Sequence, residues 1–207
     1  MATLNGSDLL IATNNAGKIR ELGGLLSGLP LRLRLLSEFP QVTEVEETGD
    51  TFAENAELKA RLYSRQTGLR TLADDSGLEV DALGGAPGVL SARYGGAGAT
   101  DVERNARLLD ELSRVEDRRR TARFICVIAL HEPEAGATRF FTGRCEGSIS
   151  TAPRGENGFG YDPLFVPADY ELTFGELPDE VKRGISHRAL ALAAVRDYLT
   201  ERLSATA

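Results

Sequence analysis

The sequence of this 207-residue chain predicts a mixed α/β domain, in which helices alternate with strands. Short apolar runs at 9–12 and 124–130 are typical of buried strands. Two Thr-x-x-Glu patterns, at 51–54 and 100–103, are capping boxes, which satisfy the free amides at the start of a helix. A strand pair in the middle of the chain completes the pattern.

The first half of the chain begins with a strand–turn–helix unit. The strand at 9–12 runs into a polar turn at 13–18, and apolar residues then recur at helical spacing, at Ile19, Leu22, Leu25 and Leu26. The capping box at Thr51 opens a second helix, whose apolar face is expected to be Phe52, Ala56, Ala60 and Tyr63. A short strand at 70–73 follows and is expected to end at Asp74-Asp75-Ser76-Gly77.

The second half continues the alternation. After a glycine-rich stretch at 84–98, the capping box at Thr100 opens a helix with an apolar face of Val102, Ala106, Leu109 and Leu112. Strands at 124–130 and 139–149 form a predicted hairpin, and a second glycine-rich segment follows at 155–163. Ser186-His187-Arg188 lead into a last helix, which carries Leu190, Ala194, Val195, Tyr198 and Leu199.

Composition and charge narrow the classes of function. The chain has 42% hydrophobic and 27% charged residues, as ordinary globular proteins do, and no apolar run reaches the roughly 18 residues of a membrane span. Residues 1–8 lack the basic-then-apolar pattern of a secretion signal, so we expect a cytoplasmic protein without membrane partners. The formal net charge of −7 gives no support for nucleic-acid binding, and the basic run at 118–120 is expected to face solvent.

The turn at 13–18 has the ingredients of a phosphate site. It is not a P-loop, because Ala12 and Ile19 stand where that motif requires glycine and serine or threonine. A turn that feeds a helix N-terminus nevertheless presents free amides and a positive dipole end, and Lys18 adds a charge. A capped turn with a surface lysine explains the same residues equally well.

Carboxylates follow the predicted strand at 70–73, and strand ends of α/β sheets commonly bind ligands. Asp74 and Asp75 are adjacent on an extended chain and therefore point to opposite sides, so one of them is expected to face a cleft. That carboxylate can hold Mg²⁺ or activate a water, and an Asx-type turn explains the same residues equally well. Glu46-Glu47 offers further oxygen ligands, or else only loop charge that faces solvent.

Two later segments have groups that suit a nucleotide base. Gly158-Phe159-Gly160-Tyr161-Asp162-Pro163 has two aromatic rings that can form a flat surface for a base, or can serve only as anchors of a turn. His187-Arg188, at a predicted helix start, offers donors to an acceptor such as a purine 6-oxo group.

Taken together and in this order, these segments resemble the inosine triphosphate pyrophosphatase family, also called XTP/dITP diphosphatases. The similarity covers about residues 9–199. Its matching pieces are Thr13–Lys18, Glu47–Gly49, Thr51–Ala56, Leu72–Leu78, Gly84–Gly88, Ser91–Tyr94, Gly158–Pro163 and Ser186–Arg188.

The resemblance implies a fold and a reaction. It implies one domain over residues 1–207, with an elongated mixed β-sheet and flanking helices that form two lobes around a nucleotide cleft, and usually a homodimer. The implied enzyme is Mg²⁺-dependent and hydrolyses XTP, ITP and dITP between the α and β phosphates, giving the monophosphate and pyrophosphate. ATP has a 6-amino donor where these substrates have an oxygen, so donors in the site are left unpaired when adenine enters.

The resemblance also implies a role for each site residue. Asp75 is the proton acceptor, Glu47 and Asp75 hold Mg²⁺, and Ser76 contacts the substrate. The residues that cradle the triphosphate are Thr13, Asn14, Asn15, Ala16, Gly17 and Lys18. Those that shape the base pocket are Phe159, Gly160, Tyr161, Asp162, Lys182, His187 and Arg188.

Two other functions share part of this pattern. A purine-nucleotide sensor without hydrolytic activity would need Lys18 and the aromatic segment but not both Glu47 and Asp75. A related pyrophosphatase for modified pyrimidine nucleotides would lack the donors of His187-Arg188. The chain has both acids and both donors, which favours the purine enzyme.

Overall fold

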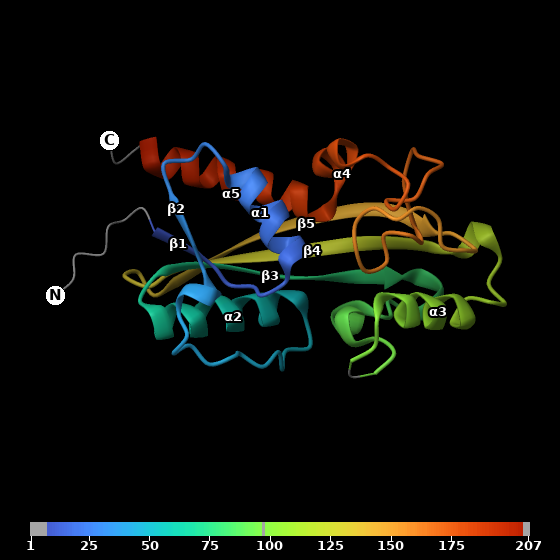
Figure 1. The fold of residues 1–207 in the computed structure, drawn as a ribbon, viewed down its shortest axis with the longest axis horizontal. Helices are drawn as coiled ribbons and strands as arrows, with labels where there is room; N and C mark the ends of the chain where they lie inside the picture. Colours follow the sequence, from blue (N-terminus) through green and yellow to red (C-terminus); the bar gives the residue numbers. More distant parts are fainter. Residues whose placement is uncertain (1–7, 97, 205–207) are drawn as a thin grey trace. The chain divides into compact units, whose positions relative to one another are not determined.

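The computed structural model describes residues 8–96 and 98–204. Residues 1–7, which belong to the N-terminal segment expected to lack a secretion signal, lie outside the described residues. Within the described residues, six strands form one sheet in the order β2-β1-β3-β4-β5-β6 (Figure 1). The strands are β1 (Asp8–Ile11), β2 (Arg32–Leu35), β3 (Arg70–Val80), β4 (Thr121–Glu132), β5 (Ala137–Ile149) and β6 (Phe165–Pro167). The α-helices are α1 (Ala16–Leu26), α2 (Phe52–Thr67), α3 (Asp101–Glu111), α4 (Asp179–Ile185) and α5 (His187–Ser204). The short 3₁₀ helices are η1 (Leu36–Glu38), η2 (Asp81–Leu83), η3 (Gly88–Arg93) and η4 (Asp117–Arg119).

The predicted mixed α/β class is confirmed. None of the helices in the described ranges is long and apolar enough to cross a membrane.

The chain divides into two units. The first comprises Met1–Asp75, Cys126–Thr142 and Ala191–Ala207, and the second comprises Ser76–Ile125 and Gly143–Leu190. The long strands β3, β4 and β5 each contribute residues to both units. Each unit has its own hydrophobic core, formed by apolar side chains from its separate segments.

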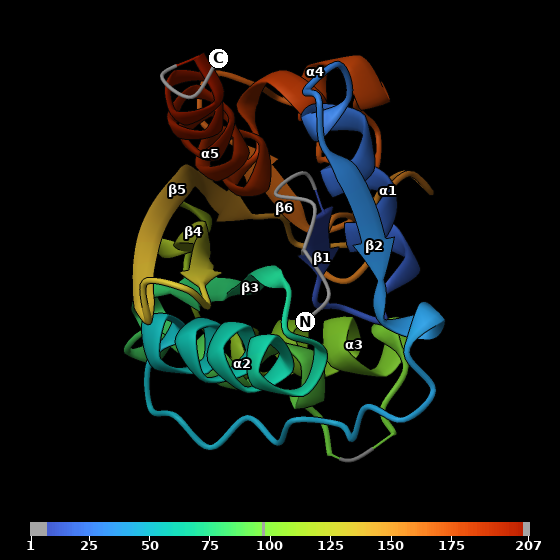
Figure 2. The ribbon, with the colours of Figure 1, turned by 90° about the vertical axis from the view of Figure 1, so that its left-hand side faces the viewer.

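The first unit is built on a parallel ladder. β1 pairs in parallel with β2 on one side, Asp8 opposite Arg32, and with β3 on the other, Ile11 opposite Leu72. α1 and the C-terminal part of α5 cover one face of these strands, and α2 covers the other (Figure 2). The core on the α1 and α5 side consists of Leu9, Ile11, Leu22, Leu26, Leu72, Cys126, Ile128, Leu130, Ala191, Leu192, Val195 and Leu199.

The predicted start of α2 is confirmed in atomic detail. The Thr51 hydroxyl accepts from the Glu54 amide at 3.2 Å, and the Glu54 carboxylate accepts from the Thr51 amide at 3.0 Å. The helix ends at Thr67, and its C-cap is Gly68, whose φ of 73° lies in the left-handed region that favours glycine. Its predicted apolar face is buried, and the polar residues Asn55 and Lys59 are buried with it.

β3 is longer than predicted. Instead of ending at residue 73 it runs to Val80, so Asp74-Asp75-Ser76-Gly77 lie inside the strand and not after it. The parallel pairing with β1 does end at Leu72, while β4 remains the neighbour of β3 on the other side. The aspartates therefore follow the end of the parallel ladder on a strand that continues, because partners distant in sequence keep it extended.

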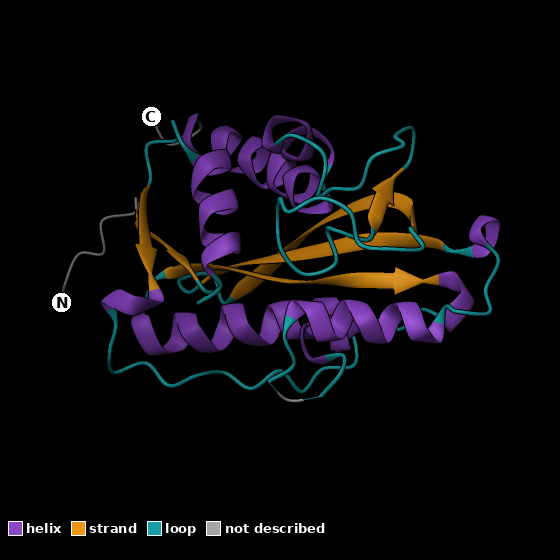
Figure 3. Cartoon of the chain, turned by 45° about the vertical axis from the view of Figure 1, so that its right-hand side comes forward, coloured by secondary structure: helices purple, strands orange, loops and turns teal. Residues whose placement is uncertain are grey.

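The second unit has a core of its own. Its residues are Leu78, Val80, Tyr94, Leu108, Leu112, Ala122, Phe124, Cys145, Ile149, Tyr161, Leu164, Phe165, Phe174 and Leu177. β6 pairs antiparallel with β5, and a Cβ at Gly147 would come within 2.2 Å of the Val166 carbonyl oxygen, so this strand pair requires glycine there. Long irregular segments lead from β5 to β6 and from β6 to α4 (Figure 3).

Two expectations for the second unit were wrong. Val102 and Ala106, predicted on the apolar face of α3, are both exposed, Val102 at 76%, and the helix buries Asn105 and Leu108 instead. Arg120, predicted to face solvent, is buried because its guanidinium donates to the carbonyls of Leu112 and Val115 at 3.0 and 3.1 Å. It thereby satisfies free carbonyls after the end of α3.

Candidate active site

The segment after β1 forms a helix start with open amides. α1 begins at Ala16, so Ala16, Gly17 and Lys18 form its first turn and not the polar turn that was predicted. Asn15 is the N-cap, and its side chain accepts from the Lys18 amide at 3.1 Å. The Thr13 hydroxyl accepts from the Asn15 amide at 3.2 Å. Because Asn14, Asn15 and Ala16 are exposed, this helix start is accessible to an anion.

Asp74 and Asp75 point to opposite faces of the sheet, as predicted from the alternation of side chains along a strand. Asp74 lies on the side of α1, where its carboxylate pairs with Lys18 Nζ at 2.9 Å. Asp75 lies on the side of α2, where it contacts Asn55 and Lys59. The buried Asp74 thus holds the end of Lys18, and Asp75 belongs to a separate group of polar side chains.

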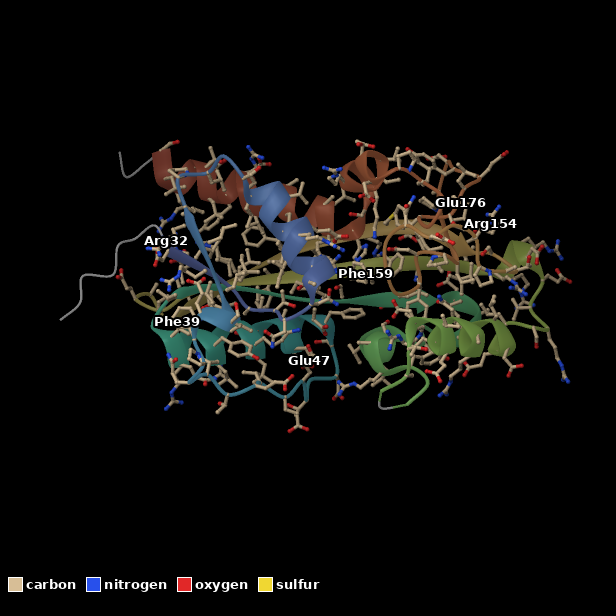
Figure 4. The ribbon with its side chains drawn as sticks, viewed as in Figure 1. Arg32, Phe39, Glu47, Arg154, Phe159 and Glu176 are labelled. Atoms are coloured by element: carbon tan, nitrogen blue, oxygen red, sulfur yellow. The ribbon has the colours of Figure 1, made fainter. Side chains whose placement is uncertain are left out.

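This second group, which we call the carboxylate cluster, consists of Glu47, Asn55, Lys59 and Asp75. Lys59 Nζ hydrogen-bonds to the Glu47 carboxylate, donates to the Asp74 carbonyl at 2.7 Å and lies 3.9 Å from Asp75 Oδ1. Asn55 Nδ2 donates to Asp75 Oδ2 at 3.2 Å. Glu47 lies on the irregular segment that precedes α2 (Figure 4).

Burial and the neighbouring charges shift the pKa values of this cluster. Burial raises the pKa of Asp75 to about 6, Lys59 opposes this rise, and the negative charge of Glu47 reinforces it. Burial on its own lowers the pKa of Lys59, but the carboxylates of Asp75, Asp74 and Glu47 outweigh it and hold that pKa above its usual value. Asp75 is therefore a carboxylate poised close to neutral pH, which suits a proton acceptor.

The carboxylate cluster presents two carboxylate groups, the kind of ligand that a hard metal ion prefers. Over residues 8–96 and 98–204, no group of three or more His, Cys, Asp or Glu side chains could enclose a metal by itself. Glu47 faces Lys59, whereas Glu46 is exposed, so Glu47 is the member of the acidic pair that accompanies Asp75. Two carboxylates match Mg²⁺, which usually takes one or two protein oxygens and completes its shell with phosphates and water.

In the second unit, Asp162 organises the turn that begins at Gly158. Its Oδ2 accepts from the Phe159 amide at 2.8 Å and from Lys182 Nζ at 2.5 Å. Both Asp162 and Lys182 are buried. Gly158 has a φ of 78°, and a Cβ there would come within 2.0 Å of Asp162 Oδ2, so the turn requires glycine at this position. We call residues 158–162 the Phe159 turn.

Two cations lie against the ring of Phe159. Lys182 Nζ is 5.0 Å and the Arg188 guanidinium carbon is 5.8 Å from the ring centroid. Arg188 also donates to Ser76 Oγ at 3.0 Å. Phe159, which is labelled in Figure 4, is half-buried, whereas Lys182 and Arg188 beside its ring are buried. A ring with charged donors beside it can contact a flat heterocycle with polar edges.

Tyr161 and His187 lie deeper. Tyr161 belongs to the core, and its hydroxyl donates to the Ser91 carbonyl at 2.9 Å. The ring of Tyr161 thus anchors the Phe159 turn and does not form one flat surface with Phe159. His187 opens α5, and its ring stacks on Phe124 at a centroid distance of 4.7 Å and an interplanar angle of 13°.

α3 holds the middle of the Phe159 turn. The Gly160 amide donates to Asp101 Oδ2 at 2.7 Å, and Asn105 Nδ2 donates to the Gly160 carbonyl at 3.1 Å. Asp101 and Asn105 are one helical turn apart, as are Asn55 and Lys59 on α2. Sequence reasoning missed all four residues. A signal existed for Asn55 and Lys59, because they interrupt the apolar face of α2 at helical spacing.

Comparisons with known proteins match nearly the whole chain, including the residues described above. The model of the Ham1 family matches residues 9–198. The chain is 52% identical over 192 residues to a dITP/XTP pyrophosphatase of Geobacter sulfurreducens, covering 92% of this chain and 96% of the relative. It is 47% identical to a dITP/XTP pyrophosphatase of Listeria monocytogenes, covering 94% and 96%.

A solved structure has the same fold. The chain matches a HAM1 protein from Coxiella burnetii with a TM-score of 0.88 and 46% sequence identity, over 94% of this chain and 98% of that one. The resemblance that the sequence motifs carry is therefore confirmed by sequence and by fold. On this evidence the chain belongs to the Ham1 family.

Proposed function

We propose that this protein hydrolyses the non-canonical purine nucleotides XTP, ITP and dITP to the nucleoside monophosphate and pyrophosphate. Two relatives that share about half of their residues with this chain are dITP/XTP pyrophosphatases. The observation that carries the proposal is the arrangement around residues 74–75 of β3, where Lys18 lies on one side and the carboxylate cluster on the other. Hydrolysis removes these nucleotides from the pool that supplies nucleic-acid synthesis.

In this mechanism the residues of the first unit bind the triphosphate and direct the water. Phosphate oxygens bind to the exposed amides at the start of α1 and to the Lys18 ammonium. These donors stabilise the negative charge that builds up on the phosphate oxygens during hydrolysis. Asp75 accepts a proton from the attacking water through a carboxylate oxygen. Lys59 stays charged, because the surrounding carboxylates raise its pKa, and it offsets part of their repulsion toward the phosphates.

We propose Mg²⁺ as the metal, held by Glu47 and Asp75. Carboxylate oxygens suit this hard cation, and two of them leave positions for substrate phosphates. When bound, Mg²⁺ neutralises phosphate charge and makes the phosphorus more open to attack. The protein residues contribute the orientation of the water and of the triphosphate.

In the second unit, the Phe159 turn and the start of α5 bind the base. Phe159 offers a partly open ring, and Ser76 is held by Arg188. We propose that His187 and Arg188 donate toward the 6-oxo group. Adenine presents an amino group there, which leaves buried donors unpaired and disfavours ATP.

The proposal extends to location and assembly. The protein acts in the cytoplasm, where the nucleotides that it removes would otherwise reach polymerases. It forms a homodimer, as the family resemblance implies, and light scattering of the purified protein measures its mass directly.

Replacing Lys18 with alanine is expected to raise the KM for ITP about tenfold or more, because the positive charge that contacts the triphosphate is lost. Steady-state kinetics at saturating Mg²⁺ measure this. Arg20→Ala is the matched control, since Arg20 is an exposed cation on the same helix. An unchanged KM and kcat in Lys18→Ala would remove Lys18 from the site.

Replacing Arg188 with methionine is expected to lower the preference for ITP over ATP, measured as the ratio of their kcat/KM values, about tenfold. The reason is the loss of a donor that hydrogen-bonds to the 6-oxo group of ITP. The control is Arg183→Met, which removes an exposed cation on α4. A ratio that stays within twofold of that of the unmodified protein would exclude Arg188 from base selection.

Rates of pyrophosphate release from XTP, ITP, dITP and ATP test the proposed function. The proposal expects turnover of the first three and far slower turnover of ATP. Tight binding of ITP without turnover at any Mg²⁺ concentration would instead identify a nucleotide sensor.

A further inference from the structure

Asn55 uses every polar group of its side chain inside the first unit. Its Oδ1 accepts from the Gly49 amide at 2.7 Å, and its Nδ2 donates both to the Gly49 carbonyl and to Asp75 Oδ2, each at 3.2 Å. The residue is fully buried on α2. One amide group therefore joins the segment that carries Glu47 to the strand that carries Asp75.

The segment before α2 is seated tightly on this amide. A Cβ at Gly49 would come within 2.7 Å of Glu54 Cβ and 2.9 Å of Asn55 Oδ1, so only glycine permits the contact. Glu47 is two residues away from Gly49, and its carboxylate is held by Lys59, one helical turn after Asn55. Two adjacent turns of α2 thus fix both the backbone and the carboxylate of this segment.

Asn55 also makes the two oxygens of Asp75 unequal. Oδ2 accepts the Asn55 hydrogen bond, and Oδ1 is the oxygen that faces Lys59 at 3.9 Å. A carboxylate held in this way cannot rotate freely about its last bond without losing a buried hydrogen bond. A water or a metal therefore meets one fixed orientation of Asp75.

We propose that Asn55 is a positioning residue for hydrolysis. It sets the orientation of the Asp75 carboxylate and the position of Asp75 relative to Glu47. The inference rests on the proposed function, because it assigns to Asn55 the alignment of the proton acceptor in that reaction. Alignment matters for rate more than for affinity, since misplacement of a reacting group raises the barrier while the phosphate contacts remain.

The test compares Asn55→Leu, which keeps the number and branching of the side-chain heavy atoms and removes the hydrogen bonds, with Glu54→Ala. Glu54 accepts from the amides of Asp50 and Thr51, so its loss loosens the same segment without touching Asp75. At saturating Mg²⁺ and over a range of ITP concentrations, we expect kcat of Asn55→Leu to fall about 30-fold or more, with KM within about threefold of that of the unmodified protein. Glu54→Ala is expected to keep kcat within about threefold while its Tm falls.

Asn55→Ser, whose hydroxyl is too short to reach Asp75, replaces the leucine variant if that variant does not fold. A kcat within threefold of the unmodified protein in the folded Asn55 variant would overturn the inference. So would an equal loss of kcat in Glu54→Ala, because Asn55 would then act only through the stability of the segment. If the unmodified protein itself releases no pyrophosphate, the proposed function fails, an outcome that is distinct from both.

Discussion

Asp75→Asn is expected to lower kcat for ITP about 10³-fold, because an amide cannot accept the proton that the attacking water loses. Asparagine has the same shape, so the fold and the Lys18 side of β3 remain, and nucleotide binding should persist. Rapid-quench or steady-state pyrophosphate release measures kcat, and equilibrium dialysis with ITP measures binding. Undiminished turnover would refute the role of Asp75.

The same substitution is expected to stabilise the metal-free protein. Burial raises the folded-state pKa of Asp75 to about 6 from an ordinary value of 3.8. The protonated carboxyl is therefore the form that the fold favours, so its contribution to stability is fully present below pH 4 and is lost as pH rises through 6. At pH 8 the difference corresponds to a cost on the order of 3 kcal/mol. Asparagine resembles the protonated form at every pH and avoids that cost.

Thermal unfolding in EDTA at pH 8 and at pH 4.5 tests this sign. Asp75→Asn should exceed the unmodified protein in Tm at pH 8, and the difference should shrink at pH 4.5. A lower Tm for Asp75→Asn at pH 8 would show that the pairing of Asp75 with Lys59 outweighs the cost of burial. Loss of activity together with gain of stability is the expected signature of a strained functional carboxylate.

Asp162→Asn is expected to lower the free energy of unfolding by about 3 kcal/mol, because it removes the negative charge that the buried Lys182 ammonium contacts. Lys182 Nζ lies 2.5 Å from Asp162 Oδ2, and the two side chains are only 9% and 4% exposed. The KM for ITP should also rise, since Asp162 holds the Phe159 amide. Urea unfolding and steady-state kinetics measure the two effects.

Two controls separate this buried pair from ordinary surface charge. Adding Lys182→Met to Asp162→Asn removes the buried ammonium as well and should recover much of the lost stability, giving a strong coupling in the double-mutant cycle. Arg118→Ala breaks a pair whose side chains are 83% and 64% exposed and should change stability by less than about 1 kcal/mol. Additive effects of the two substitutions at 162 and 182 would show that the pair is not a stabilising unit.

The parts of the fold that local chemistry decides could be predicted from the sequence. The starts of α2 and α3 lie at the capping boxes of Thr51 and Thr100, because those hydrogen bonds join residues three positions apart. The extent of β3 could not be predicted, because Asp74 to Gly77 has the composition of a turn and only its neighbours in the sheet keep it extended. The short elements β2, β6 and α4 were not predicted either.

The candidate site divides in the same way. The motifs and the family resemblance led to Lys18, Glu47 and Asp75, and the structure pairs each of them with a buried partner. Asn55 and Lys59 were missed, because a polar residue on a helix is usually solvated. Their partners lie 6 to 20 residues away in sequence, on the segment before α2 and on β3, so only the packing of α2 against these parts explains why the two residues are buried.

The most direct test of the central claim is ³¹P NMR of ITP incubated with the purified protein, with Mg²⁺ and with EDTA. Cleavage between the α and β phosphates predicts IMP and pyrophosphate in equal amounts with Mg²⁺, no reaction in EDTA, and no signal from IDP. Release of IDP and inorganic phosphate, or binding of ITP without any cleavage, would contradict the assignment of the carboxylate cluster to this reaction.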